Sequence, residues 1–245
     1  MTIALIDGDI VVYRTSWTLK EDDSLDIANW RASQMMEEIL RDTEASEYLL
    51  FLSGGENFRK TLYPAYKANR IDKPKPRALE HVREYLVLDW NAKVTDGIEA
   101  DDALGIAQND ETIICTIDKD LLMVPGRHYN FVKKEFYFVD RHEARRTFYK
   151  QLLLGDRSDN VPGYDGMARQ KPTKIIQAWY NEIDACANDL EMLEIVRAAY
   201  GYDDERLLLT GNLLHIQQEE GQTWQLPNAE PQLKSMTRTA EETTP

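Results

Sequence analysis

The sequence predicts an α/β fold with a doubly wound, mostly parallel sheet, followed by a helical region. Two observations support this prediction. Short apolar runs recur in the first half of the chain, separated by helix-compatible sequence, and each ends in Asp, Ser or Gly, as buried parallel strands commonly do. Beyond about residue 141 the strand pattern disappears and helical periodicity takes over. The order strand, helix, strand places a ligand site beyond the carboxyl ends of the strands.

The first predicted elements are three strands and one helix. Strands are expected at Ile3–Ile6, Tyr48–Leu52 and Thr112–Ile117. A helix at Asn29–Asp42, between the first two strands, carries its apolar residues on one face, which suits packing against a sheet. Acidic residues follow the first and third strands directly, so they are expected at the edge of the sheet where a ligand would lie.

An edge hairpin and three helices follow these elements. The apolar segments Tyr129–Val132 and Phe136–Val139 suggest antiparallel strands at an edge of the sheet. The helical region is expected to contain helices at Phe148–Leu154, Ile175–Tyr180 and Glu191–Ala199.

The change of pattern divides the chain into three parts. Residues 1–145 are expected to form the α/β domain, with a basic segment at about 60–90, and residues 146–226 a helical region. Residues 227–245 are polar, contain Pro, Thr and Glu, and show no apolar period, so we expect them to be disordered.

Composition and charge narrow the functional classes. The 245 residues are 42% hydrophobic and 29% charged, and no apolar run approaches the roughly 20 residues that cross a bilayer. The N-terminus lacks the basic start of a signal peptide, so we expect a cytoplasmic protein, in the host cytoplasm if a phage encodes it. The net charge of −14 argues against a uniformly basic surface. Between Arg59 and Arg83, however, eight basic residues accompany two acidic ones, which makes a local basic patch.

Acidic residues cluster where strands and turns are predicted to end. Hard divalent cations such as Mg²⁺ prefer carboxylate oxygens, and two of them about 4 Å apart can hold the attacking and leaving oxygens of a phosphoryl transfer. Any single acid could instead be a helix cap or a solvated loop residue. Four groups on one chain favour a metal site. The clustered acids are Asp7, then Glu99, Asp101 and Asp102, then Asp118 and Asp120, and then Asp156 and Asp159.

Five sequence blocks occur in order over about residues 3–180. They are Leu5-Ile-Asp-Gly8, then Asn57-Phe-Arg-Lys60 with Tyr66-Lys-Ala-Asn-Arg70, then Gly97-Ile-Glu-Ala-Asp-Asp102, then Thr116-Ile-Asp-Lys-Asp-Leu121, and then Gly155-Asp-Arg-Ser-Asp-Asn-Val-Pro-Gly163. Together they resemble the 5′-nuclease family, which includes flap endonucleases, the 5′-to-3′ exonuclease domain of bacterial DNA polymerase I, and stand-alone phage exonucleases. The compact length is most similar to the phage enzymes.

The resemblance implies a PIN-like fold, two Mg²⁺ or Mn²⁺ ions held by carboxylates, and hydrolysis of phosphodiesters by a two-metal mechanism. The acids that match the first metal site and its surroundings are Asp7, Glu99, Asp101 and Asp102. Those that match the second site are Asp118, Asp120, Asp156 and Asp159. Lys67 and Arg70 match the catalytic basic pair near the scissile phosphate, where cations offset charge that builds on the phosphoryl oxygens.

The resemblance also implies DNA contacts in two regions. The basic stretch at 70–83 matches a helical arch or clamp through or under which a single 5′ strand passes. A glycine turn after residue 162 matches a helix-turn-helix (H3TH-like) element that holds duplex phosphates and often K⁺. Ala168 and Pro172 depart from its pattern, which weakens the case for K⁺. The expected contacts are Lys73, Lys75 and Arg77 in the first region, Arg59, Lys60 and Tyr66 shortly before it, with Tyr66 stacking on a base, and Gly163, Gly166, Arg169, Lys171 and Lys174 in the second region.

A further departure follows the second predicted strand. The family usually carries an Asp there, whereas this chain has Ser53, with Glu56 farther along the loop. Either Ser53 with a water, or Glu56, completes the shell of the first metal, or that metal binds more weakly.

The predicted function is that of a 5′-to-3′ exonuclease or flap endonuclease in DNA replication or repair. Its expected partners are DNA with 5′ ends or flaps, RNA–DNA hybrids, and a separate polymerase or single-strand-binding protein, without a membrane. Two alternatives stay open. A DNA-binding module with a degenerate site would explain the missing Asp. A phosphatase of the haloacid-dehalogenase type would explain the Asp-x-Asp of Asp7 and Asp9, and its late acidic motif loosely resembles Gly155-Asp-Arg-Ser-Asp159. It leaves the acids of 99–102 and 118–120 and the basic segment unexplained.

Overall fold

The structure is a computed structural model that describes residues 2–71 and 73–227, so the predicted disorder of 227–245 falls outside the described residues except at Pro227. Its centre is a six-stranded sheet in which neighbouring strands are parallel except for the last pair. In spatial order the strands are β3 (Lys93–Val94), β2 (Glu47–Leu52), β1 (Ile3–Asp7), β4 (Thr112–Cys115), β5 (Gly126–Asn130) and β6 (Glu135–Val139).

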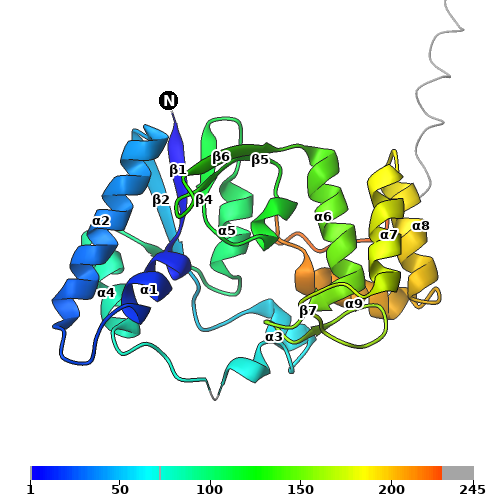
Figure 1. Cartoon of the computed structure of the whole chain (residues 1–245), viewed down its shortest axis with the longest axis horizontal. Helices are drawn as coiled ribbons and strands as arrows, with labels where there is room; N and C mark the ends of the chain where they lie inside the picture. The colour runs from blue at the N-terminus through cyan, green and yellow to red at the C-terminus, as the bar shows by residue number, and fades with distance from the viewer. Residues whose placement is uncertain (1, 72, 228–245) are drawn as a thin grey trace, which may run out of the picture.

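Helices cover both faces of the sheet and form a separate group at one end (Figure 1). On one face lie α1 (Gly8–Trp17), α2 (Leu25–Thr43) and α4 (Leu79–Asp89), and on the other lies α5 (Ala100–Ala107). The end group contains α6 (Arg141–Leu154), α7 (Lys174–Ala185), α8 (Asp189–Ala199) and α9 (Asp204–Leu214). The remaining elements are α3 (Phe58–Leu62), the 3₁₀ turns η1 (Ala68–Arg70) and η2 (Asp120–Met123), and the pair β7 (Gly155–Asp156) and β8 (Val161–Pro162).

Alternation along the central strand explains why the sheet is covered on both faces. Ala4 and Ile6 of β1 pack into the cluster that includes α1, α2 and α4, while Leu5, which points the opposite way, packs against α5. All three side chains are fully buried. A strand with two apolar faces needs helices on both sides, and this is what the apolar run predicts.

The junction between β1 and α1 sets the position of Asp7. Its side chain accepts a hydrogen bond from the Ile10 amide (3.1 Å) and so caps α1. The next residue must be glycine, because a Cβ on Gly8 would lie 2.4 Å from the Phe51 carbonyl oxygen of β2. Short, capped connections of this kind place the side chain of the last strand residue at the edge of the sheet.

The predicted fold class is confirmed, and so is the antiparallel hairpin at the sheet edge. The predicted strands and helices correspond to β1, β2, β4, α2, α6, α7 and α8, several of which begin earlier than expected. Strand β3 and helix α9 were not predicted. The division near residue 145 stays a prediction. No helix in the described ranges is long and apolar enough to cross a membrane.

Candidate functional site

Acidic side chains from separate parts of the chain gather at the carboxyl end of the parallel strands. Asp7 is the last residue of β1, and Asp118 follows β4, the strand beside it. Glu99 and Asp101 stand at the N-terminus of α5. Asp159 lies in the turn between β7 and β8, which follow α6. Adjacent parallel strands end at the same edge of a sheet, so this convergence follows from the topology.

Burial and mutual repulsion disfavour ionisation of the first group of acids. Burial raises the pKa of Asp7 to about 7, although hydrogen bonds from Thr116 Oγ1 (2.7 Å) and the Ile10 amide oppose the shift. Burial also raises the pKa of Asp101 well above its usual value, and the charges of Asp7 and Asp118 add to the effect. A bound cation favours the charged form of such carboxylates, so the group attracts cations.

A second group of acids, Asp118, Asp120, Asp156 and Asp159, adjoins the first. Burial raises the pKa of Asp120 to about 7, with the charges of Asp118 and Asp156 adding to it, and burial also raises the pKa of Asp118. The Asp120 amide donates to Asp118 Oδ1 (2.9 Å), while the amide and hydroxyl of Ser158 donate to Asp156 Oδ1 (2.6 and 2.7 Å). The structure brings both groups together, and their role as metal ligands stays a prediction.

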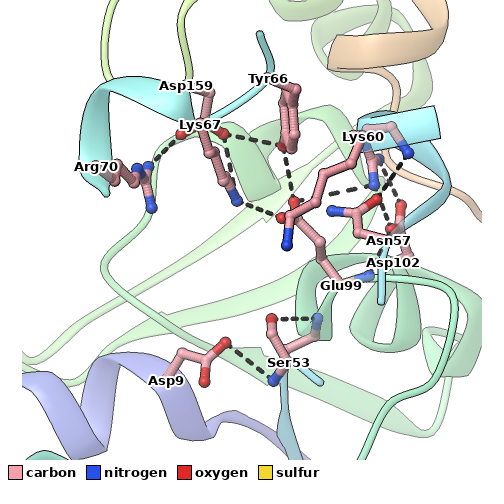
Figure 2. Close-up of polar contacts among 12 residues, drawn as sticks. Asp9, Ser53, Asn57, Lys60, Tyr66, Lys67, Arg70, Glu99, Asp102 and Asp159 are labelled. Atoms are coloured by element: carbon pink, nitrogen blue, oxygen red, sulfur yellow. Dashed lines mark hydrogen bonds and ion pairs between the residues drawn. The ribbon is translucent and has the colours of Figure 1, made fainter. Parts of the chain in front are cut away.

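Lys67 contacts an acid of each group, and Arg70 contacts Asp159 of the second group (Figure 2). Lys67 Nζ donates to Glu99 Oε1 and lies 3.4 Å from Asp159 Oδ2. Arg70 Nη2 donates to Asp159 Oδ1, and Arg70 Nε donates to the Ser158 carbonyl (3.1 Å). Burial alone would lower the pKa of Lys67, but the charges of Glu99 and Asp159 outweigh it and raise the pKa. The two predicted catalytic cations thus neutralise part of the acid cluster.

Tyr66 belongs to the wall of the site rather than to its surface. Only 4% of the residue is exposed, and its hydroxyl lies 2.9 Å from Glu99 Oε2 and 3.0 Å from Asp159 Oδ2. Burial and these two charges raise the pKa of the phenol. The ring has no face free to stack on a base, so the expected DNA contact of Tyr66 is corrected. Its hydroxyl instead links two acids that come from distant parts of the chain.

Asp102 and Arg59 form a buried pair with each other. Arg59 Nη1 and Nη2 donate to the two carboxylate oxygens (2.6 and 2.8 Å), and Arg59 also donates to the carbonyls of Leu213 and His215. The Gln217 amide donates to Asp102 as well (3.0 Å). Burial opposes ionisation of Asp102, but the hydrogen bonds and charge of Arg59 hold its pKa below the usual range. The expectations that Asp102 ligates metal and that Arg59 contacts DNA are therefore corrected.

The remaining acids suit a hard divalent cation in chemistry, but they form an open set. Across residues 2–71 and 73–227, no three His, Cys, Asp or Glu side chains are arranged to hold a metal ion as they stand. Carboxylate oxygens are the ligands that Mg²⁺ and Mn²⁺ prefer. The raised pKa values of Asp7, Asp101 and Asp120 reflect buried charge that the chain leaves uncompensated. The donor set fits such an ion, provided that the side chains close around it.

A basic cavity adjoins the acids under the segment between α3 and α4. Its volume is about 740 Å³, and its lining includes Lys60, Lys67, Arg70, Lys75 and Arg83. The expected helical arch is helical only at η1 and α4, because the described residues between them form turns and bends. The cavity offers cationic donors to phosphate groups, and the DNA contacts of Lys60 and Lys75 stay predictions.

Arg77 and Lys73 differ from the other predicted contacts of this segment. Arg77 Nη2 donates to the carbonyls of Lys20 and Asp23 (2.9 and 2.7 Å), so it ties the segment to the loop after α1. Lys73 is exposed and does not line the cavity. Its contact with DNA stays a prediction.

The glycine turn after β8 is held by its own backbone. The Gly163 amide donates to the Met167 carbonyl (2.9 Å) and the Gly166 amide to the Gly163 carbonyl (3.0 Å). A Cβ on Gly163 would lie 2.5 Å from the Leu153 carbonyl oxygen, so close packing on α6 explains this glycine. Gly166 has a φ of +82°, which suits a glycine in a turn. Both amides are used within the turn, so they would have to leave these carbonyls to hold phosphate, and the DNA contact of Gly163 and Gly166 stays a prediction.

Three basic residues beyond this turn were also predicted to contact DNA. Arg169 donates two hydrogen bonds to the carboxylate of Asp165, and these bonds raise the pKa of the Arg169 guanidinium. Lys171 and Lys174 are exposed, and Lys174 is the first residue of α7. Lys171 and Lys174 remain predicted contacts, whereas Arg169 would first have to leave Asp165.

The missing Asp after β2 is accompanied by contacts that were not predicted. Ser53 Oγ accepts a hydrogen bond from the Ala100 amide (2.9 Å), and Glu56 is exposed. Asp9, considered earlier only for the phosphatase alternative, accepts from the Ser53 amide (3.0 Å) and from Arg83 Nη1 (2.9 Å). The Asp-x-Asp spacing was the available signal for Asp9. Arg83 had been counted only as part of the basic patch.

Comparison with known proteins identifies the family to which most of the chain is similar. Residues 2–150 match the family described as 5′-3′ exonuclease, N-terminal resolvase-like domain. Thermostable DNA polymerase I of Thermus aquaticus is 26% identical over 214 residues, or 78% of this chain and 26% of the polymerase. A 5′-3′ exonuclease of Buchnera aphidicola is 23% identical over 216 residues, or 78% of this chain and 75% of that protein. The chain spans about a quarter of the length of the polymerases it matches.

Solved structures share the fold. A T5 protein co-crystallised with metal ions superposes with a TM-score of 0.66 at 16% identity, covering 87% of this chain and 89% of that one. A bacteriophage T5 flap endonuclease in a complex with DNA and metal ions gives a TM-score of 0.64 at 17% identity, with the same coverage. At these identities the likeness concerns the fold alone.

Proposed function

The chain belongs to the family of 5′-3′ exonucleases with an N-terminal resolvase-like domain, and from that premise we propose that it hydrolyses DNA phosphodiesters at 5′ ends or flaps with the help of divalent metal ions. RNA–DNA hybrids at primers are a further substrate of the same chemistry. The phosphatase alternative is set aside, because this chain, which carries the Asp-x-Asp motif, belongs to the exonuclease family instead.

One observation carries the proposal. Two clusters of buried and half-buried carboxylates lie side by side next to an open basic cavity, where Lys67 contacts an acid of each cluster and Arg70 contacts Asp159 of the second. A purely structural set of acids would be paired throughout, as Asp102 is with Arg59. Burial and the charges of Asp7 and Asp118 instead raise the pKa of Asp101, which points to a ligand at this position.

The chain's own residues have distinct roles in this proposal. Seven acids would hold the ions, whereas Lys67 and Arg70 would turn from the acids to the phosphate and offset its developing charge. Bound divalent cations supply Lewis-acid stabilisation of the phosphate and activate water. The cavity lined by Lys60 and Lys75 would admit a single strand and bind its backbone without regard to sequence. The proposed metal ligands are Asp7, Glu99, Asp101, Asp118, Asp120, Asp156 and Asp159.

A second candidate function, a DNA-binding module without catalysis, is favoured by the open arrangement of the acids in the described part of the chain and by Ser53 in place of an acid. Such a module would bind flapped DNA equally well with and without Mg²⁺ and release no product. The basic cavity would serve such a module as well as a nuclease.

An end-label assay separates the two functions. DNA with a 5′ flap, a nick, a blunt end or an RNA primer is incubated with the protein in Mg²⁺ and in chelator. We expect Mg²⁺-dependent product from wild type, none from Asp118→Asn, and near-normal product from Glu56→Gln, because Glu56 is exposed on its loop. Binding without cleavage in Mg²⁺, or equal turnover by wild type and Asp118→Asn, would refute the nuclease.

A further inference from the structure

Ser53, at the end of β2, uses all three of its polar groups in contacts with other elements. Its hydroxyl oxygen accepts from the Ala100 amide at the start of α5 (2.9 Å), and its own amide donates to Asp9 Oδ2 of α1 (3.0 Å). Its carbonyl accepts from Arg83 Nη2 of α4 (2.7 Å), and Arg83 Nη1 donates to Asp9 Oδ1 (2.9 Å). Figure 2 shows Asp9 and Ser53 below the acids. We call Asp9, Ser53 and Arg83 the clasp.

The clasp connects the helix that returns from the basic segment to the helix that presents the acids. Arg83 is on α4, which follows that segment, and Ala100 is the first residue of α5, between Glu99 and Asp101. The first amides of a helix have no partner within it, and a hydroxyl oxygen is a good acceptor for one of them. Ser53 therefore fixes the first turn of α5 from a neighbouring strand, at the point where Glu99 and Asp101 project.

We infer that Ser53 and Arg83 are positioning residues that hold Glu99 and Asp101 in place for a divalent cation, and that the chain uses Ser53 for this purpose instead of ligating the ion with it. The inference rests on the proposed function. It accounts for the serine where the family resemblance leads one to expect an aspartate: a serine oxygen bonded to the Ala100 amide is directed at α5. Asp9 orients Arg83 so that both of its bonds form.

Arg83 tests the inference through the direction in which its removal changes the affinity for a metal ion. The residue is a cation whose side chain is 23% exposed, it pairs with Asp9, and it lines the same cavity as Glu99. If it acted only through its charge, its removal would strengthen the binding of another cation. If it positions the acids through Ser53, its removal weakens that binding, because Glu99 and Asp101 lose part of their fixed geometry. The two explanations predict opposite changes.

The experiment measures the affinity for Mn²⁺ alone, by electron paramagnetic resonance of free Mn²⁺, without DNA. We expect Ser53→Ala to bind Mn²⁺ about fivefold more weakly, the factor that corresponds to loss of one capping hydrogen bond. Arg83→Met is expected to bind about threefold more weakly as well. The conservative variants Ser53→Thr and Arg83→Lys keep the acceptor and the donors and should restore affinity to within about twofold of wild type.

Arg31→Met is the matched control. Arg31 belongs to α2, on the same face of the sheet as α4, and it contacts Thr18 and Asp23 but no residue of the clasp. Thermal melting and circular dichroism of each variant show that the comparison concerns folded protein. Unchanged Mn²⁺ affinity in Ser53→Ala, or unchanged or tighter binding in Arg83→Met, overturns the inference and leaves the proposed function standing. Failure of the wild type to bind Mn²⁺ overturns the proposed function and this inference with it.

Discussion

Lys67 lies between two carboxylates that belong to different parts of the chain. Glu99 is at the start of α5 and Asp159 is in the turn between β7 and β8, and the ammonium group contacts both. The backbone of Lys67 is left-handed (φ 56°), a conformation that costs a non-glycine residue about 1 kcal/mol. Two ion pairs and a hydrogen bond from its amide to the Asp159 carbonyl (2.8 Å) hold it there. Lys67 therefore serves as an internal counter-ion while no other cation is bound.

Replacing this counter-ion should affect metal binding and catalysis in opposite directions. Lys67→Met removes the cation that competes for Glu99 and Asp159, so we expect tighter Mn²⁺ binding without DNA. The same change removes a donor that would neutralise the phosphate, so we expect the cleavage rate to fall by about a hundredfold or more. Calorimetric Mn²⁺ titration and single-turnover kinetics measure the two effects. Weaker metal binding would contradict the counter-ion role.

Asp102 shows the other fate of a buried acid. Its carboxylate is fully buried and is matched by Arg59, so breaking the pair leaves a guanidinium without its partner. Removal of one partner from a buried pair costs about 3–5 kcal/mol, and we expect Asp102→Asn to lower the free energy of unfolding by an amount near that range. Asp184→Asn, which breaks the exposed Lys150 pair, is the control and should cost less than about 1 kcal/mol. Denaturant unfolding measures both, and equal losses would contradict this account.

At the scale of elements, the basic side chains between α3 and α4 differ in whether they face the cavity or are bonded elsewhere in the protein. Lys75 lines the cavity, whereas Arg77 is bonded to the loop after α1. We expect Lys75→Met to weaken DNA binding similarly for all sequences and to reduce the slope of log affinity against log salt by about 1. Arg77→Met should change that slope less. A salt titration of fluorescence anisotropy measures both slopes, and a larger change for Arg77→Met would reverse the assignment.

The sequence predicts an element well when neighbouring residues alone carry its pattern, and poorly when the element depends on residues far away in the chain. Strands β1, β2 and β4 are predictable because each is an apolar run that ends in a turn residue, whereas β3 has two residues, too few for any pattern. Helix α9 was missed although its N-cap, Asp203, is a recognisable start. Asp102 was misassigned because its partner Arg59 lies 43 residues away, and nothing in the spacing distinguishes a paired acid from a free one.

At the scale of the whole molecule, the site lies where two apolar cores meet. One core consists of the two clusters that cover the faces of the sheet, and the other is built from α6 to α9. Tyr66 comes from the segment before α4 yet packs in the second core, and Arg59 of α3 bonds to the Leu213 carbonyl of α9. Glu99 and Asp159 face each other across this junction through Tyr66 and Lys67. Acids from both sides are brought together because the cores are joined there.

The acids at this junction should make stability depend on pH. The pKa of Asp7 is about 7 in the fold against 3.8 for an unperturbed Asp, so the folded state binds the proton more tightly. Stability is therefore lost as pH rises from about 4 to about 7, and the penalty is complete above that range. Asn at this position cannot ionise and escapes the penalty, which is on the order of a few kcal/mol.

In chelator we expect the melting temperature of Asp7→Asn, relative to wild type, to increase as the pH is raised from about 5 to about 8. Added Mg²⁺ at the higher pH should stabilise wild type more than the variant, because an ion compensates the charge that Asp7 carries. Differential scanning fluorimetry over this range measures the difference. A gap between the two proteins that does not vary with pH would show that Asp7 is already ionised in the fold.

The central claim is that the two acid clusters hold divalent cations. An anomalous difference map from crystals soaked in Mn²⁺ tests it most directly, since it locates the ions without any assumption about activity. We expect Mn²⁺ peaks bounded by Asp7, Glu99 and Asp101 and by Asp118, Asp120, Asp156 and Asp159, with Lys67 displaced from Glu99. Well-diffracting soaked crystals with no Mn²⁺ peak among these acids, or with Mn²⁺ bound only elsewhere, would contradict the claim.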